Sequence, residues 1–130
     1  MNFDGDTVIA IDPGVRNGVA HLAYYSELRI IGVYHLEILY KETLIKDLNN
    51  PLVNYKGIIC EDWITTSHMN ATQHREVLTT IGNIEHICSS VSKVPLIMRK
   101  PQQREIARKA FGFCKKAHDN DAFSAMLHGI

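Results

Sequence analysis

The stretch "TVIAIDPGVRNGVAHL", from Thr7 to Leu22, decides the fold. Its first half is a run of β-forming residues that carries one acid, Asp12, just before Pro-Gly. This run, bounded by turn formers, predicts a buried strand over Thr7–Pro13. A second apolar run predicts another strand over Gly18–Tyr25. An acid before Pro-Gly is most often a turn former, and the alternative for Asp12 is a role in chemistry.

The next segments alternate between strand and helix patterns. Leu28–His35 predicts a third strand, which would complete an antiparallel meander. "LEILYKETLIKDLNNP", residues 36–51, carries apolar residues at helical spacing and predicts a helix that Asn-Asn-Pro closes. "KGIICEDWI", residues 56–64, is apolar on both faces until it reaches acid. That double-sided apolarity is typical of a central, parallel strand.

The second half predicts three more helices and one strand. A core-facing apolar stripe marks a long helix over Asn70–Ser92, and "VPLIM", residues 94–98, is a short fifth strand. Pro101 opens a helix, because the first helical turn accepts proline, and a last helix covers about Ala117–Leu127. The chain of 130 residues is therefore expected to be a single domain, 1–130. Its fold class would be α/β, with a five-stranded mixed sheet flanked by helices.

Composition excludes several classes of protein. The chain is 45% hydrophobic and 22% charged, as in ordinary globular proteins and unlike disordered ones. No apolar run approaches the roughly 18 residues of a membrane span, and the acidic start of the chain is unlike a secretory signal. Its three cysteines form no Cys-x-x-Cys pair, which indicates a reducing compartment. We expect a cytoplasmic protein with no membrane partner and no organic cofactor.

The net charge of zero hides a gradient along the chain. Residues 93–116 contain eight basic residues and one acid, a net charge of +7, and the remainder carries −7. This asymmetry indicates either an anionic partner on one face or a solvated helix surface.

Four side chains could form a catalytic cluster. Asp12 and Glu61 end the first and fourth strands, which would project them from one end of the sheet if those strands are neighbours. His118 and Asp121 lie one helical turn apart and share a helix face. Acids that converge in one cleft need protons or cations, and oxygen-rich clusters suit Mg²⁺ or Mn²⁺. Two such ions could activate a water against a phosphodiester.

Other assignments remain open for individual residues. Asp62 competes with Glu61, and His118 is a ligand, a proton carrier or only a helix-terminal residue. The remaining histidines show no ligand spacing and are assigned structural roles: His21, His35, His68, His74, His86 and His128.

In combination, "IAIDPGVRNGVAHL", "GIICEDW" and "HDNDAFSAML" resemble the RuvC-like Holliday-junction resolvases, above all the compact versions found in phages. The resemblance covers nearly the whole chain. It implies a ribonuclease H-like fold and a homodimer that cuts branched DNA with Mg²⁺ or Mn²⁺, in the host cytoplasm if the chain is phage-encoded. The family's catalytic, metal-binding positions match Asp12, Glu61, His118 and Asp121. The imidazole of His118 in place of an oxygen ligand favours Mn²⁺ or a proton-carrying role.

The basic segment then becomes a candidate DNA-binding surface, since lysine and arginine neutralise backbone phosphates. Arg16, beside Asp12, could contact the scissile strand or form a surface salt bridge. The helix Asn70–Ser92 is the candidate dimer interface, and core packing alone is the alternative explanation of its apolar stripe. The candidate nucleic-acid-binding residues are Arg16, Lys100, Arg104, Arg108, Lys109, Lys115 and Lys116.

Two alternatives stay open. One is a nuclease that acts on RNA or RNA–DNA hybrids, since the hairpin also resembles the small YqgF-like relatives of resolvases, although those lack the "CEDW" arrangement. The other is a non-catalytic module that binds branched DNA, which would gain nothing from clustered acids near phosphates.

Overall fold

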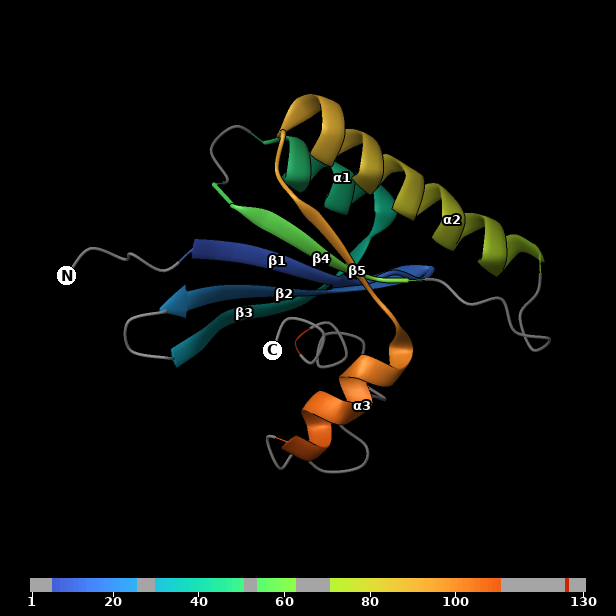
Figure 1. Cartoon of the computed structure of the whole chain (residues 1–130). Coiled ribbons are helices and arrows are strands. Elements are labelled where there is room, and N and C mark those ends of the chain that lie inside the picture. The colour runs from blue at the N-terminus through green and yellow to red at the C-terminus, as the bar shows by residue number, and fades with distance from the viewer. Residues whose placement is uncertain (1–5, 26–29, 51–53, 63–70, 111–125, 127–130) are drawn as a thin grey trace.

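The structure is a computed structural model that describes residues 6–25, 30–50, 54–62, 71–110 and 126. Over these residues the strands form one twisted sheet, and helices lie on both of its sides (Figure 1).

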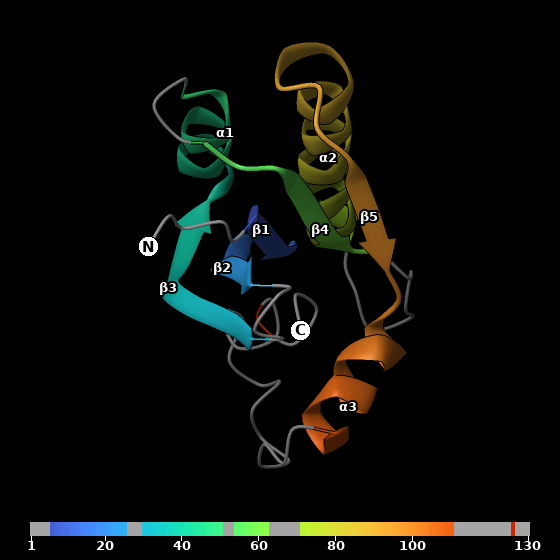
Figure 2. The same ribbon diagram turned by 60° about the vertical axis from the view of Figure 1, so that its left-hand side comes forward.

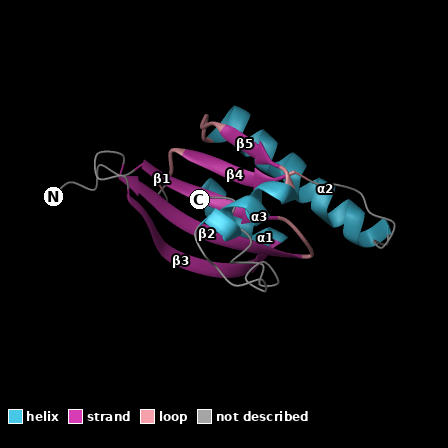
Figure 3. Cartoon of the chain, turned by 60° about the horizontal axis from the view of Figure 1, so that its bottom comes forward, coloured by secondary structure: helices cyan, strands magenta, loops and turns pink. Residues whose placement is uncertain are grey.

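The sheet is five-stranded with the order β3-β2-β1-β4-β5, as Figure 3 shows. The central strand β1 (Asp6–Asp12) pairs antiparallel with β2 (Arg16–Tyr25), and β2 pairs antiparallel with β3 (Ile30–Tyr40). On its other side β1 pairs parallel with β4 (Gly57–Glu61), which pairs parallel with β5 (Leu96–Arg99). The predicted meander with two added parallel strands is confirmed.

The described helices occupy opposite sides of the sheet (Figure 2). α1 (Lys41–Asn49) and α2 (Ala71–His86) lie on one side, and α2 continues into a π-helical turn, η1 (Ile87–Val91). α3 (Pro101–Ala110) lies on the other side. The predicted long helix and the helix that opens at Pro101 are both confirmed. None of the helices in the described part of the chain is long and apolar enough to cross a bilayer.

Alternation along the strands divides the apolar residues into two cores. The larger core fills the α1/α2 face, where Ile9, Ile11 and Val19 meet side chains of both helices. The smaller core lies on the opposite face, which we call the α3 face. Its buried members are Ala10, Ala20, Leu22, Ile59 and Met126, and Ala107 of α3 packs against them.

One element boundary differs from the prediction. The segment expected to be helical from Leu36 continues β3 to Tyr40, and α1 begins only at Lys41. Apolar residues at Leu36, Leu39 and Tyr40 satisfy a helical period, but this segment pairs with the first half of β2, with Tyr40 opposite Arg16. Pairing with β2, which is about 20 residues away in the sequence, therefore makes this segment a strand although its local pattern also fits a helix.

The last predicted helix, 117–127, falls outside the described residues except at Met126. Met126 is helical and buried on the α3 face.

Candidate active site at the ends of β1 and β4

Asp12 and Glu61 end adjacent parallel strands. The pairing of β1 with β4 reaches Ile11 opposite Cys60, and the two acids are the next residues on each strand. Because Ile11 and Cys60 belong to the core on the α1/α2 face, alternation directs the residues after them to the α3 face. The two carboxylates predicted from sequence therefore occupy one end and one face of the sheet, and both are half-buried.

The same alternation separates Glu61 from its neighbour. Asp62 follows β4, is exposed, and donates its backbone N–H to the carbonyl of Arg99 over 2.7 Å. Because successive residues of an extended chain point to opposite faces of a sheet, Asp62 faces away from the side that Glu61 occupies. Glu61 is thus the acid that shares a face with Asp12.

A buried amide fixes the turn that follows Asp12. Asn17 is fully buried; its Oδ1 accepts from the backbone N–H of Gly14 and its Nδ2 donates to the carbonyl of Leu39, each over 3.1 Å. Gly14 is confined as well, since a Cβ there would lie 2.9 Å from the carbonyl oxygen of Arg16. The turn is thereby tied to β3, which holds the end of β1 in place.

The strand ends concentrate negative charge. Burial raises the pKa of the Cys60 thiol, and the nearby carboxylates of Asp12, Glu61 and Asp62 raise it further. Cys60 therefore stays a neutral thiol and is unsuited to nucleophilic chemistry. Carboxylates gathered in this way repel one another until a cation or a proton joins them. Oxygen ligands of this kind suit Mg²⁺ or Mn²⁺.

Arg99 is a site residue that the sequence reasoning missed. It ends β5 directly opposite Glu61. Its Nε is buried and has no hydrogen-bond partner among the described residues. A buried guanidinium N–H on the strand next to Glu61 could meet an anionic ligand. The only sequence signal was a single basic residue at the end of an apolar strand.

The predicted nucleic-acid-binding residues are only partly described. Arg16 is exposed at the start of β2, Lys100 is exposed just before α3, and Lys109 is exposed within α3. Arg108 is buried and donates to the Glu105 carboxylate one turn earlier. Arg104 belongs to α3, whereas four predicted residues lie outside the described chain: Lys115, Lys116, His118 and Asp121.

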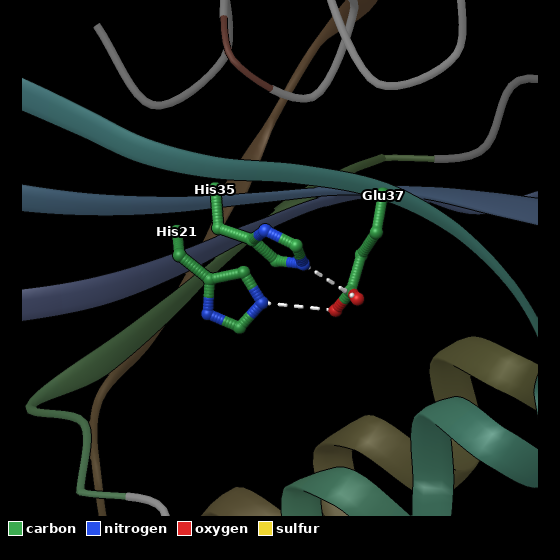
Figure 4. Close-up of side chains that lie close together, drawn as sticks. All are labelled: His21, His35 and Glu37. Atoms are coloured by element: carbon green, nitrogen blue, oxygen red, sulfur yellow. Dashed lines mark hydrogen bonds and ion pairs between the residues drawn. The ribbon is translucent and has the colours of Figure 1, made fainter.

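A second cluster lies on the α1/α2 face, away from the acids (Figure 4). The Nε2 atoms of His21 and His35 are 3.0 Å and 2.9 Å from the two carboxylate oxygens of Glu37. Sequence reasoning assigned both histidines structural roles, because ligand spacing is not visible when partners come from different strands.

By sequence, no protein-family model and no curated protein matches the chain. By structure, RuvC of T. thermophilus, solved in complex with a Holliday junction substrate, matches with a TM-score of 0.67 at 14% identity, over 94% of this chain and 89% of that one. The fowlpox virus Holliday junction resolvase matches with a TM-score of 0.61 at 14% identity, over 95% and 94%. Its complex with substrate Holliday junction DNA matches at 0.59 and 14% identity, over 94% and 93%. The chain therefore has the ribonuclease H-like fold of these resolvases, as the sequence predicted.

Proposed function

We propose that this chain is a metal-dependent endonuclease that cleaves phosphodiester bonds in branched DNA such as Holliday junctions. The observation that carries the proposal is the shared face and shared strand ends of Asp12 and Glu61, within a fold that solved resolvases match over nearly their whole length. Fold alone does not fix chemistry, so the paired acids are what favour a nuclease. The reaction would take place in the cytoplasm.

Asp12 and Glu61 are the residues that would hold Mg²⁺ or Mn²⁺. Their carboxylates are half-buried on adjacent strands. Both are close enough to Cys60 to raise the pKa of its thiol. A bound pair of divalent ions supplies an activated water and stabilises the leaving oxygen. The chain's own part is to position the carboxylates rigidly, through the β1–β4 pairing and the turn that Asn17 holds.

His118 and Asp121 complete the proposed cluster. Met126 supports their placement, because it is buried on the α3 face, the face that carries Asp12 and Glu61. It follows Asp121 by five residues, a segment that spans at most about 18 Å. In this proposal Asp121 is a third carboxylate ligand, and His118 is a ligand or carries a proton to or from the reacting oxygens.

The DNA backbone would lie over the α3 face. Ala107 docks α3 on that face, and Lys100 and Lys109 are exposed there. Arg99 would donate to the phosphate held between the acids. The remaining predicted contacts, including Arg16 but not Arg108, which is buried against Glu105, would neutralise further phosphates, so that binding weakens with salt and reads no sequence.

We propose a homodimer, since one two-fold axis presents two identical sites to the two strands of a junction. α2 is the candidate interface. Leu78 and Val91 are large apolar residues that stay about half exposed on α2 and η1.

The decisive experiment is cleavage of a labelled four-way junction by the full chain with Mg²⁺, with Mn²⁺ and with EDTA. We expect cleavage that EDTA abolishes. Asp12→Asn and Glu61→Gln should each reduce the rate about a hundredfold or more, since several kcal/mol of transition-state charge stabilisation depend on the metal ligands. Asp62→Asn is the matched control. It removes a neighbouring carboxylate that faces the other side of the sheet, so it should keep most of the activity.

Three results would decide against the proposal. Cleavage that persists in EDTA, or in Asp12→Asn, would rule out the metal-dependent site. Faster cleavage of an RNA–DNA hybrid than of the junction would favour the hybrid nuclease. Tight junction binding with no product in either metal would favour a non-catalytic module.

A further inference from the structure

His21, His35 and Glu37 converge on one point. One ligand atom from each lies within 4.8 Å of the other two, and Figure 4 shows the three side chains turned toward one another on the side where α1 and α2 lie. The side chain of His21 is 18% exposed, that of Glu37 is 24% exposed and that of His35 is 54% exposed. The cluster is therefore sheltered on one side and open to solvent on the other.

The regular pairing of β2 with β3 brings the three residues together, and an irregularity in β3 follows directly beyond them. His21 pairs with His35, but the next residue of β2, Leu22, pairs with Val33, so Tyr34 is an extra residue in β3. Such a bulge re-aims side chains. The rings of Tyr34 and His35 both lie against the ring of His21, with centroid separations of 5.8 Å and 5.3 Å. His35 and Glu37 share a face because they are two residues apart on β3, and His21 shares that face because it pairs directly with His35.

Glu37 is poised as an anionic ligand. Burial raises its pKa, but hydrogen bonds and charge interactions with His21 and His35 outweigh burial, and the net pKa lies below the ordinary value of 4.5. The carboxylate is therefore ionised at neutral pH and only accepts hydrogen bonds, so both Nε2 atoms point at it as donors. Two imidazole nitrogens and one carboxylate oxygen form a ligand set that zinc sites use.

We propose that His21, His35 and Glu37 form a binding site for Zn²⁺, separate from the carboxylates at the ends of β1 and β4. Tetrahedral zinc with bonds of about 2.0–2.1 Å separates neighbouring ligand atoms by about 3.4 Å. The two imidazoles contact different oxygens of Glu37, at 3.0 Å and 2.9 Å, and one ligand atom of each residue lies within 4.8 Å of the others. The three side chains would therefore adjust by up to about 1.5 Å to close around one ion. Each neutral imidazole would carry its proton on Nδ1 and offer the Nε2 lone pair.

The fourth coordination position has room beside it. An open pocket of about 170 Å³ is lined by His21, Glu37 and Asp47 of α1, together with apolar residues of the α1/α2 face. A water in this pocket could complete the tetrahedron, and the Asp47 carboxylate adds negative charge. The nitrogen ligands select zinc over Mg²⁺. The site would clamp β2 to β3 beside the bulge, a structural role independent of DNA cleavage.

The test measures zinc binding rather than activity. Isothermal titration of the metal-free chain with ZnCl₂ should show a strong site, and thermal unfolding should shift upward by several degrees as free zinc exceeds the Kd many-fold. Co²⁺ as a probe should give the visible absorption of a tetrahedral site. His35→Ala should weaken zinc binding about tenfold or more, and it should fold normally because His35 is exposed. Glu37→Gln should do the same.

Two control variants test whether zinc binds at this cluster and not elsewhere on the chain. His86→Ala removes an exposed histidine of α2 and should leave the titration unchanged. Asp12→Asn disables the other candidate metal site and should also leave it unchanged. Absence of any zinc effect on the wild-type chain would overturn the proposal. So would a zinc affinity that survives His35→Ala and Glu37→Gln but falls in Asp12→Asn.

Discussion

At the scale of single residues, Asn17 holds the turn that follows Asp12 in the candidate active site. Its amide is fully buried and satisfied on both sides, by Gly14 in the turn after Asp12 and by Leu39 in β3. We expect Asn17→Ala to lower the free energy of unfolding by about 1–3 kcal/mol, because it leaves a partly buried N–H and a partly buried carbonyl without their amide partner. Urea denaturation followed by circular dichroism measures this loss.

Asn83→Ala is the control for that substitution. Asn83 is exposed on α2, so its replacement by a better helix former should leave stability unchanged or raise it slightly. Equal stability of Asn17→Ala and wild type would mean that the turn holds itself without the amide. In that case Asn17 could not be what positions the end of β1.

The sequence predicted Asp12 and Glu61 because their signal is local. Each acid ends an apolar run, and two such runs in a parallel pair must end on the same edge. His21, His35 and Glu37 had no such signal. His21 meets the other two only through the register of β2 with β3, which a single segment does not encode. Arg99 was missed for the same reason, since its proximity to Glu61 comes from the β4–β5 register.

At the scale of elements, Tyr55 joins two helical ends. It is buried, and its hydroxyl donates to the carbonyl of Leu48 near the end of α1 over 2.8 Å and lies 2.7 Å from the hydroxyl of Ser92, just after η1. Burial raises its pKa, so the phenol stays neutral. Tyr55→Phe keeps the ring but removes both hydrogen bonds, and we expect a loss of about 1–3 kcal/mol in thermal or urea unfolding.

Tyr40→Phe provides the comparison, because Tyr40 is 61% exposed at the junction of β3 and α1. Its replacement should change stability by less than about 0.5 kcal/mol. If Tyr55→Phe proved equally neutral, the ends of α1 and η1 would be held by apolar packing alone.

Element types were more predictable than element boundaries. The apolar stripe of α2 and the proline at the start of α3 are local signals, and both helices formed as expected. The start of α1 was wrong by five residues, because Leu36–Tyr40 carries a pattern compatible with strand or helix. Only the partner strand β2 resolves that ambiguity, and sequence-local reasoning does not include the partner.

At the scale of the whole molecule, the two faces of the sheet carry different groups of side chains. The α1/α2 face holds the larger core and the proposed zinc site. The α3 face holds the smaller core, the paired acids and the basic helix α3. Within the described residues, the basic helix α3 thus shares one face of the sheet with the paired acids, an arrangement suited to a polyanion held by divalent metal.

The exposed surface of α2 is where two copies of the chain would meet in the proposed dimer. Leu78 is 48% exposed on α2, and Gly82, one turn further, has open space where a Cβ would be. If this surface forms the proposed dimer, Leu78→Glu should shift the chain toward monomer in analytical ultracentrifugation while circular dichroism stays unchanged. On a cruciform-bearing supercoiled plasmid, paired cuts give linear product, so the variant should accumulate nicked circles instead. Ile106→Glu, at a residue 67% exposed on α3, should keep the dimer. A dimer that tolerates Leu78→Glu but dissociates with Ile106→Glu would move the interface to α3 and remove that helix from the DNA-binding surface.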